Sequence, residues 1–408
     1  MKRPRIRMTG LWIVLFLSLP LVSHAETLSV AWVELGAEGR VSARIVVDSI
    51  QNCPDIVIDG QRQFMTPRLP LPDGLRPACE AIIPANAKAA SVNGQALALP
   101  KPNPSKVVVL GDTGCRIKDT LVQACNDPEQ WPFARVSSQA ATEMPELVIH
   151  VGDYLYREIP CPAGSETLCG GTPAGDNWET WNADFFAPAA SLLRAAPWAL
   201  SRGNHEDCNR AWRGWFYYLD PGNVKPACEI YSPIYIVTLG AMNLVMFDSS
   251  ATVESANDET QIFQYASQLA SLHVSNAWLV DHHPFWGFRP GVTDANPILL
   301  SEPLEAAWDR SKVKGISMVL SGHVHLFELL SFDHGRPTQL VAGTGGTNLQ
   351  MSIQKSVTGT LAHGATVVMS GSQSEFGYTL LTKSGNNWKL LLKSRDGKTL
   401  FSDDIVKP

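Results

Sequence analysis

In the segment Lys106-Val-Val-Val-Leu-Gly-Asp-Thr-Gly114, a short β-branched run leads directly into a Gly-Asp loop. The segment Leu147-Val-Ile-His-Val-Gly-Asp-Tyr-Leu-Tyr156 repeats this arrangement. Strands this apolar are typical of a sheet buried on both faces. Two later strands are predicted at Ala277–Val280 and Ile316–Leu320, and both run into loops that contain histidines. The ends of these strands are therefore where we expect a functional site.

Helical patterns separate several of these strands and place the chain in the α/β class. They lie at Pro188–Arg194 and Thr260–Leu272. Buried strands with helices between them predict an α/β core. The tail from Phe376 to Val406 returns to strands.

The region before Lys106 has a different character. From Leu28 to Leu99, Gly and Pro separate short β-like runs without a helical period, which predicts a small β-sandwich. The runs are Leu28–Val33, Val41–Val47 and Asp55–Ile58. A proline-rich linker at Pro100–Pro104 follows. We therefore expect a β-sandwich-like domain with its linker at residues 26–103 and a second domain at residues 104–408.

The first 25 residues have the pattern of a signal peptide. Four basic residues precede an apolar run at Leu11–Val22, and Ser23-His24-Ala25 supplies small residues at a cleavage site. The alternative is an uncleaved anchor, but a dozen apolar residues broken by Pro20 fall short of the ~20 that a spanning helix needs. We expect export to a periplasmic or extracellular location, and no membrane span in the mature chain.

The charge balance disfavours one class of partner. The chain has 33 basic and 39 acidic residues, and loss of the four basic residues of the leader would leave 29, a net charge of −10. A net-acidic surface disfavours wrapping a nucleic-acid backbone, because neutralisation of phosphates by Lys and Arg supplies most of that affinity.

Eight cysteines in an exported chain predict disulfides, and none has a CxxC spacing. Eight cysteines allow 105 pairings. The simplest pairing joins sequence neighbours: Cys53 with Cys79, Cys115 with Cys125, Cys161 with Cys169, and Cys208 with Cys228.

Five short polar motifs occur in series after the predicted strands. They are Gly111-Asp112-Thr113-Gly114, Gly152-Asp153-Tyr154-Leu155-Tyr156, Gly203-Asn204-His205-Glu206, Asp281-His282-His283-Pro284 and Gly322-His323-Val324-His325. A single Asp or His after a strand is usually a turn former or a satisfied polar group. Five in series offer the bridging carboxylate, hard oxygen ligands and imidazoles that a pair of metal ions needs. The adjacent glycines allow a close approach of the backbone.

The order and spacing of these motifs resemble the calcineurin-like metallophosphoesterases, and within them the purple acid phosphatase pattern, over Lys106–Leu349. The resemblance implies a four-layer α/β/β/α metallophosphoesterase sandwich, here preceded by the small β-sandwich domain. Most of that superfamily has a histidine two residues after the first aspartate, where this chain has Gly114. Tyr156 stands where the purple phosphatases have a phenolate ligand, and a phenolate suits ferric iron.

The resemblance also implies roles for single residues. Metal 1 would be held by Asp112, Asp153, Tyr156 and His325, and metal 2 by Asp153, Asn204, His282 and His323. His205 would face the phosphoryl group and assist the leaving oxygen. His282 is preferred to His283 as the ligand. His283 is expected either to support the ligands from behind or to line the pocket, and Glu206 is expected to support the ligands.

Three further features have a structural interpretation. Gly343–Asn348 lacks the lysine spacing of a P-loop, so we expect a tight loop near the site. The tryptophans Trp178, Trp181, Trp198 and Trp278 are expected to pack the core. Arg157–Trp178, rich in Gly and Pro, is expected to form a disulfide-stapled rim.

The predicted function is an exported phosphatase that hydrolyses small phosphomonoesters with a metal-bound hydroxide. Metal 1 would be Fe(III) and metal 2 a divalent ion (Fe, Zn or Mn). The alternatives are phosphodiester or nucleotide hydrolysis at the same site, an adhesion module in the N-terminal region, and a catalytically retired binding protein. The last would show a missing ligand, and all seven are present.

Overall fold

The computed structural model describes Met1 and residues 30–405, except for residues 119, 254–257, 290–297, 300–301, 363 and 386. The predicted signal peptide at residues 1–25 lies, apart from Met1, outside the described residues. Within these ranges, no helix combines the length and the apolar character needed to cross a membrane.

Two large sheets form the centre of the molecule. The ten-stranded sheet has the order β26 (Thr399–Ile405), β25 (Asn387–Ser394), β24 (Gly377–Ser384), β9 (Lys106–Leu110), β12 (Leu147–His150), β13 (Trp198–Leu200), β1 (Trp32–Leu35), β2 (Val41–Val46), β6 (Ala78–Ile82) and β5 (Thr66–Pro67). The eight-stranded sheet has the order β14 (Tyr235–Leu239), β15 (Met242–Met246), β16 (Ala277–Val280), β19 (Ile316–Ser321), β21 (Thr338–Ala342), β20 (Phe327–Phe332), β23 (Ala365–Gln373) and β22 (Leu361–Ala362).

Alternation along the strands produces the layers. On β9, Val107 and Val109 pack into the core between the sheets, where they share a cluster with Val280 and Leu320 of the other sheet. Val108 faces the opposite way and packs in a second cluster. That cluster includes residues of α1 (Phe133–Thr142), α3 (Trp178–Trp181), the π-helix η3 (Asn182–Phe186) and α4 (Ala190–Ala195).

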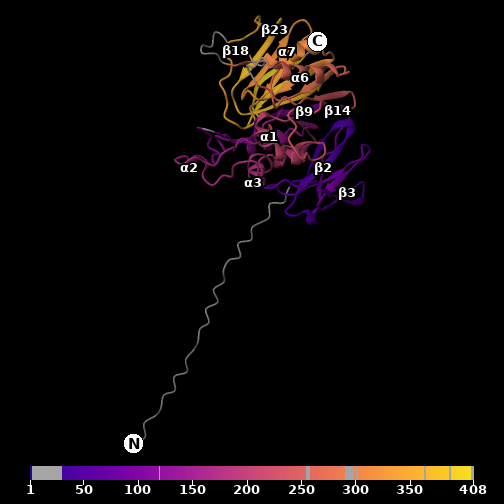
Figure 1. The fold of residues 1–408 in the computed structure, drawn as a ribbon, viewed down its shortest axis with the longest axis vertical. Coiled ribbons are helices and arrows are strands. Elements are labelled where there is room, and N and C mark those ends of the chain that lie inside the picture. The colour runs from indigo at the N-terminus through magenta and orange to yellow at the C-terminus, as the bar shows by residue number, and fades with distance from the viewer. Residues whose placement is uncertain are drawn as a thin grey trace.

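The other sheet is covered in the same way by α6 (Glu259–Ala270) and α7 (Glu302–Ser311), whose Leu269 and Leu304 pack with Leu279 and Val319. In Figure 1, α6 and α7 lie at the opposite end of the molecule from the N-terminal strands β2 and β3 (Asp55–Ile58), drawn in indigo. The predicted four-layer α/β/β/α arrangement is confirmed.

The N-terminal region is strand-rich, as predicted, but its strands are not separate from the rest. β1 pairs in parallel with β13, so the ten-stranded sheet continues across the proline-rich linker. A four-stranded sheet, β4 (Gln61–Phe64), β3, β7 (Ala90–Val92) and β8 (Gln95–Ala96), packs Ile56 and Val92 into the same core as Val33. The N-terminal sandwich therefore shares one of its two sheets with the α/β core. A boundary at residues 103 and 104 stays a prediction.

A buried ion pair ties these strands to the middle of the chain. The Arg44 guanidinium on β2 lies 2.8 Å from the Glu34 carboxylate, and both side chains are fully buried. The same guanidinium donates hydrogen bonds to the carbonyls of Tyr218 and Asp220, in and just after the π-helix η5 (Trp215–Leu219). A buried charge is tolerated only with such partners. These hydrogen bonds therefore hold β2 against η5.

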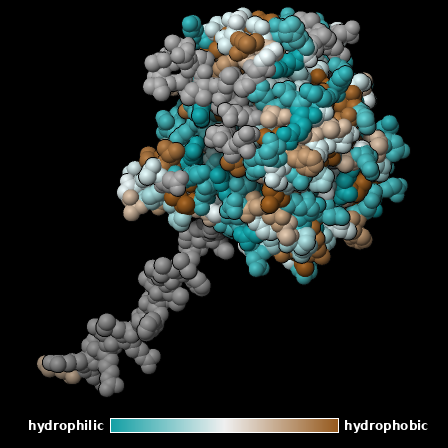
Figure 2. Space-filling model, turned by 45° about the horizontal axis from the view of Figure 1, so that its top comes forward, coloured by the Kyte–Doolittle hydropathy of each residue, from teal (hydrophilic) through white to brown (hydrophobic). Residues whose placement is uncertain are grey.

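Several sequence predictions are confirmed in detail. β9 and β16 have the predicted bounds, and the predicted C-terminal strands are β24, β25 and β26. The four tryptophans expected in the core are buried. The four disulfides join the sequence neighbours, as predicted. On the face shown in Figure 2, hydrophobic residues are scattered among hydrophilic ones.

The remaining elements are short. They are the hairpins β10 (Ile117–Lys118) with β11 (Leu121–Val122) and β17 (Phe288–Arg289) with β18 (Ile298–Leu299), the helices α2 (Glu166–Cys169) and α5 (Trp212–Gly214), and the single turns η1 (Ala37–Gly39), η2 (Ile50–Asn52) and η4 (Asn204–Glu206).

Candidate metal centre

All five motifs follow parallel strands, and Asn204 of the third motif comes after β13. Asp112 follows β9, Asp153 follows β12, His282 follows β16 and His323 follows β19. Asp112, Asp153 and His323 have φ angles of 56°, 62° and 67°. Left-handed backbone at a non-glycine residue costs free energy and is concentrated at functional sites. These three side chains thus lie at the carboxyl-terminal ends of strands from both sheets.

Glycines allow the motif loops to come into contact. A Cβ atom on Gly203 would lie 2.1 Å from Oδ1 of Asp153, and one on Gly322 would lie 2.4 Å from Oδ2 of Asp112. No other residue would fit at either position without moving a predicted ligand.

The first group of donor atoms surrounds the hydroxyl of Tyr156. This oxygen lies 3.0 Å from Oδ1 of Asp112, 2.7 Å from Oδ2 of Asp153 and 2.9 Å from Nε2 of His325. One hydroxyl hydrogen cannot serve three acceptors. A single cation would satisfy all four atoms.

The second group surrounds the side-chain oxygen of Asn204. Nε2 of His282 lies 2.9 Å and Nδ1 of His323 lies 3.1 Å from this Oδ1. Nε2 of His282 also lies 3.1 Å from Oδ2 of Asp153. Oδ2 of Asp153 therefore belongs to both groups, which is the position of a bridging ligand.

The spacing and electrostatics of both groups fit bound cations. Two donors about 2.1 Å from one octahedral ion and 90° apart are separated by ~3 Å, close to the 2.7–3.1 Å found here. Burial opposes the charged form of His282, yet Asp153 and Asp112 raise its pKa to about 10. The buried carboxylates thus attract positive charge. All seven predicted ligands are brought together.

Backbone carbonyls hold two of the buried histidines, His282 after β16 and His325 after β19. Nδ1 of His282 donates to the carbonyl of Val151 (2.8 Å), and Nδ1 of His325 donates to that of Asn348 (2.9 Å). Such bonds fix the ring so that the other nitrogen faces a metal. Asn348 belongs to the Gly-rich segment predicted as a tight loop near the site, and the backbone N–H of Thr347 there donates to the carbonyl of Asp112.

His283 lies beside the ligands in a different position from His282. Its ring packs against His323, with centroids 4.0 Å apart and the ring planes tilted by 36°, and its buried Nδ1 has no hydrogen-bond partner among the described residues. The Ser249 hydroxyl accepts the backbone N–H of both His282 (3.0 Å) and His283 (2.9 Å) and so aims the two rings. Of the two, His282 is the one directed at Asp153 and Asn204.

Glu206 contacts the loops that carry the predicted ligands Asp153 and Asn204. Its fully buried carboxylate accepts four backbone N–H groups, those of Asp153, Tyr154, Leu155 and Gly203. Burial and the nearby Asp153 raise the pKa of Glu206 to about 8, and the amide hydrogen bonds oppose this rise. The carboxylate holds together the loops that carry Asp153 and Asn204.

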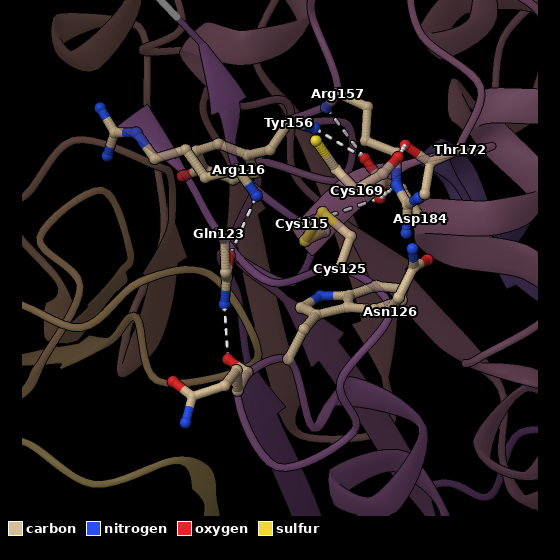
Figure 3. Close-up of a disulfide and its surroundings, with 12 residues drawn as sticks. Cys115, Arg116, Gln123, Cys125, Asn126, Tyr156, Arg157, Cys169, Thr172 and Asp184 are labelled. Carbon is tan, nitrogen blue, oxygen red and sulfur yellow. Dashed lines mark hydrogen bonds and ion pairs between the residues drawn. A yellow bond between two sulfur atoms is a disulfide. The ribbon is translucent and has the colours of Figure 1, made fainter. Parts of the chain in front are cut away.

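Asp184 has a similar role that the sequence reasoning missed. Its carboxylate accepts hydrogen bonds from the backbone N–H of Cys115 (3.1 Å) and of Tyr156 (2.9 Å). It also accepts one from Nε of Arg157 (2.6 Å). Figure 3 shows it between these residues, beside the Cys115–Cys125 disulfide. It thereby joins the first and second motif loops. The available signal was a pair of acidic residues, Glu179 and Asp184, in the otherwise uncharged segment Trp178–Phe186.

The ring of His205 packs against Tyr156, with centroids 3.8 Å apart and the ring planes tilted by 37°. Its Nε2 lies 3.9 Å from Oδ2 of Asp153, and its Nδ1 lies 2.6 Å from Oε1 of Glu158. Burial lowers the pKa of His205, while Asp153 and Glu158 oppose this. Glu158 therefore orients the ring, a role that the sequence did not reveal.

A pocket of about 580 Å³ opens on the side of Asn204, His283 and His323. Its other walls are Arg202, Asp207, Cys208, Asn209, Arg210, Ile230 and residues 250–253. Sequence reasoning expected the rim at Arg157–Trp178. No described residue of that segment lines this pocket. The predicted staple exists, but it packs with the Cys115–Cys125 disulfide (Figure 3).

Comparison with known proteins places the chain in a family. The sequence profile of calcineurin-like phosphoesterases matches residues 105–327, more than half of the chain. Among curated protein sequences, no relative was found.

Two solved structures share the fold. A purple acid phosphatase from yellow lupin (Lupinus luteus) seeds superposes with a TM-score of 0.57 at 14% identity, covering 92% of this chain and 73% of the lupin chain. A structure of PhoD superposes with a TM-score of 0.51 at 12% identity, covering 92% of this chain and 88% of that chain. Because the profile match covers more than half of the sequence, the chain belongs to the calcineurin-like phosphoesterase family.

Proposed function

We propose that this protein is an exported phosphatase that hydrolyses small phosphomonoesters at a centre of two metal ions. The observation that supports it most is the shared Oδ2 of Asp153, which lies within 3.1 Å of donor atoms from both groups. A phosphoester hydrolase with a two-metal site is what the family implies. The substrate class and export are our extension.

In this proposal, metal 1 is held by Asp112, Asp153, Tyr156 and His325, and metal 2 by Asp153, Asn204, His282 and His323. Bound ions would lower the pKa of a water molecule and neutralise the phosphoryl oxygens.

The assignment of ferric iron to metal 1 rests on Tyr156. Burial, together with Asp153 and Asp112, holds the pKa of this phenol well above its ordinary value. A strongly charged cation is therefore needed to turn it into a phenolate ligand, and a ferric ion suits that oxygen donor. Metal 2, with an amide oxygen and two imidazoles besides the bridge, suits a divalent ion (Fe, Zn or Mn).

His205 acts on the leaving group. Its Nε2 is on the side of Asp153 Oδ2 (3.9 Å), while Glu158 holds Nδ1. A protonated His205 donates its Nε2 proton to the oxygen that leaves phosphorus, a role worth ~10²- to 10⁴-fold in rate. Because this proton must be present, and because a ferric ion acidifies water more than a divalent ion, activity is expected to be greatest below neutral pH.

Export is supported by the leader pattern at residues 1–25 and by the pairing of all eight cysteines. Disulfides persist in oxidising compartments outside the cytosol. The −10 net charge of the mature chain remains an argument against wrapping of a nucleic acid.

The test combines activity with metal analysis on the same sample. We expect kcat/KM for an aryl phosphate to exceed that for the matching bis-aryl phosphate, with an acidic optimum, about one iron per chain and a visible absorption band. Tyr156→Phe should abolish the band. A higher kcat/KM for the diester would contradict the proposed monoester substrate. An active, colourless protein with an alkaline pH optimum would show that the site holds two divalent ions and no ferric iron.

A further inference from the structure

Arg210 is a cation on the pocket wall that the proposed mechanism does not use. It lies five residues after His205, and its side chain is 26% exposed. Two carboxylates are near, but not in hydrogen-bonding contact: Oε1 of Glu158 is 3.6 Å from Nη1, and Oδ2 of Asp207 is 4.0 Å from Nε. The two carboxylates attract the guanidinium but take up none of its N–H donors, which therefore remain available to a ligand.

The amide of Asn204 makes this position unusual. When Oδ1 of Asn204 faces His282 and His323, as binding of a cation requires, Nδ2 of the same amide lies 3.1 Å from Nη1 of Arg210. Two N–H donors at this distance repel each other unless one acceptor receives hydrogen bonds from both. The opposite amide orientation would satisfy Arg210, but it would turn an NH₂ group towards the two histidines.

A second observation points to a ligand at the same place. His283 is 1% exposed, lines the pocket that Arg210 lines, and has a buried Nδ1 without a partner among the described residues. The pocket wall thus combines a guanidinium, an amide N–H and an imidazole beside Asn204 and His323. An anionic oxygen is the group that would accept from such donors, because charge-assisted hydrogen bonds to Arg are about twice as strong as neutral ones.

We propose that Arg210 binds a phosphoryl oxygen of the substrate and thereby makes the enzyme prefer a phosphomonoester dianion to a diester. This inference rests on the proposed function. A monoester has one more charged, unsubstituted oxygen than a diester, so a guanidinium directed at the phosphoryl group stabilises the monoester more. Arg210 is therefore a specificity-determining residue, supplied by the loop after the third motif.

The first test measures binding of inorganic phosphate to the metal-loaded protein by calorimetry, with metal content measured on each sample. Arg210→Gln should weaken phosphate binding by about 10- to 100-fold, the loss of one or two charged hydrogen bonds. Arg210→Lys, which keeps the charge but not the planar donor pair, should give an intermediate loss. Arg310→Gln, which removes the same charge from α7 outside the pocket, is the matched control and should bind as the wild type does.

Asp207→Asn distinguishes an anion-binding role from a merely structural one. If Arg210 served only to pair with Asp207, this variant would weaken phosphate binding as much as Arg210→Gln. We expect it to bind phosphate at least as tightly as the wild type, because it removes a negative charge beside the anion. Equal phosphate affinity of wild type and Arg210→Gln, or loss of metal in Arg210→Gln and Arg210→Lys, would overturn the proposal.

The specificity half is tested by turnover. Arg210→Gln should lower kcat/KM for an aryl phosphate by about 10- to 100-fold and that for the bis-aryl phosphate by less than about 5-fold. Equal losses on both esters would refute the specificity role. If the wild type hydrolysed neither ester, the proposed function would fail, while phosphate binding would still decide whether Arg210 holds an anion.

Discussion

Asp153 is the residue on which both groups of donor atoms depend. Its Oδ2 lies beside Tyr156 on one side and His282 on the other, and its Oδ1 accepts the backbone N–H of His205 (2.8 Å). The imidazole of His205 approaches the same carboxylate only to 3.9 Å. The two residues therefore have separable roles.

We predict that Asp153→Asn loses metal and activity together, since it removes the charge shared by both sites. The loss of metal affinity should exceed the 10- to 100-fold typical of a residue that only supports a ligand. His205→Ala should retain metal and lower kcat by ~10²- to 10⁴-fold. Metal analysis and kcat on the same samples give the comparison, and an empty metal site in His205→Ala would show that its role was misassigned.

Glu206→Gln is predicted to weaken the site without touching a metal. The carboxamide would turn an NH₂ group towards two of the four backbone N–H groups that the carboxylate now accepts. We expect a loss of about 1–3 kcal/mol in the free energy of unfolding and a 10- to 100-fold loss of metal affinity.

Denaturant unfolding and metal titration would measure these effects. Glu166→Gln, at an exposed carboxylate on α2, is the control and should change stability by less than about 0.5 kcal/mol. Wild-type values for Glu206→Gln would mean that the loops do not depend on this carboxylate.

At the scale of elements, each motif is a strand followed by a loop, and the loops hold one another. Asp184 of η3 joins the loops after β9 and β12, and Glu206 joins the loops after β12 and β13. Asp184 lies 28 residues from Tyr156 along the chain, and Glu206 lies 53 residues from Asp153. The ligands are positioned by these cross-links because loops by themselves would not fix side chains closely enough for metal binding.

One strand carries a buried acid away from the metals. Glu328 on β20 is 2% exposed, and its Oε2 accepts the backbone N–H of Phe288 (3.0 Å). Burial raises its pKa to about 8 from 4.5. The folded state therefore holds a proton that the unfolded state releases, and the stability associated with it is complete below about pH 4.5 and lost as pH rises through 8.

We predict that Glu328→Gln removes this pH dependence. The stability of the wild type relative to the variant should fall between pH 5 and pH 8, by about 1.4 kcal/mol for each effective unit of pKa shift. Urea unfolding of both proteins at several pH values would measure it. Parallel stability curves would contradict an elevated pKa.

At the scale of the whole molecule, the metal centre joins the two sheets. Asp112 and Asp153 come from the ten-stranded sheet, and His282, His323 and His325 come from the eight-stranded sheet. The helices cover only the outer faces. Bound ions would therefore stabilise the packing of one sheet on the other.

We predict that chelation of the metals lowers the melting temperature of the wild type. Ligand at 100 times its Kd stabilises a folded state by about 2.7 kcal/mol. His205→Ala should show the same shift, since it keeps the ligands, and Asp153→Asn should show little. Calorimetry with and without chelator would test this. A shift that persisted in Asp153→Asn would place the stabilising ion elsewhere.

The sequence by itself determined the strand-and-loop pattern, the seven candidate ligands and the disulfide pairs. All three are encoded locally: apolar runs, Gly-Asp turns and cysteines separated by 8 to 26 residues need no knowledge of distant contacts. The order of motifs along the chain sufficed to group the ligands, because the resemblance to a family supplied the geometry.

Only the tertiary structure decided which strands lie side by side and which polar groups meet behind the ligands. β1 beside β13 and β24 beside β9 follow from backbone hydrogen bonds, which are the same for every sequence and do not specify a partner strand. Two contacts depend on loop paths that the packing of both sheets sets. They are the contact of Asp184 with Tyr156 and that of Arg210 with Asn204. Their residue types, an acid in a short helix and a base on a loop, are ordinary in sequence, and contact with a specific donor or acceptor is what gives them a role.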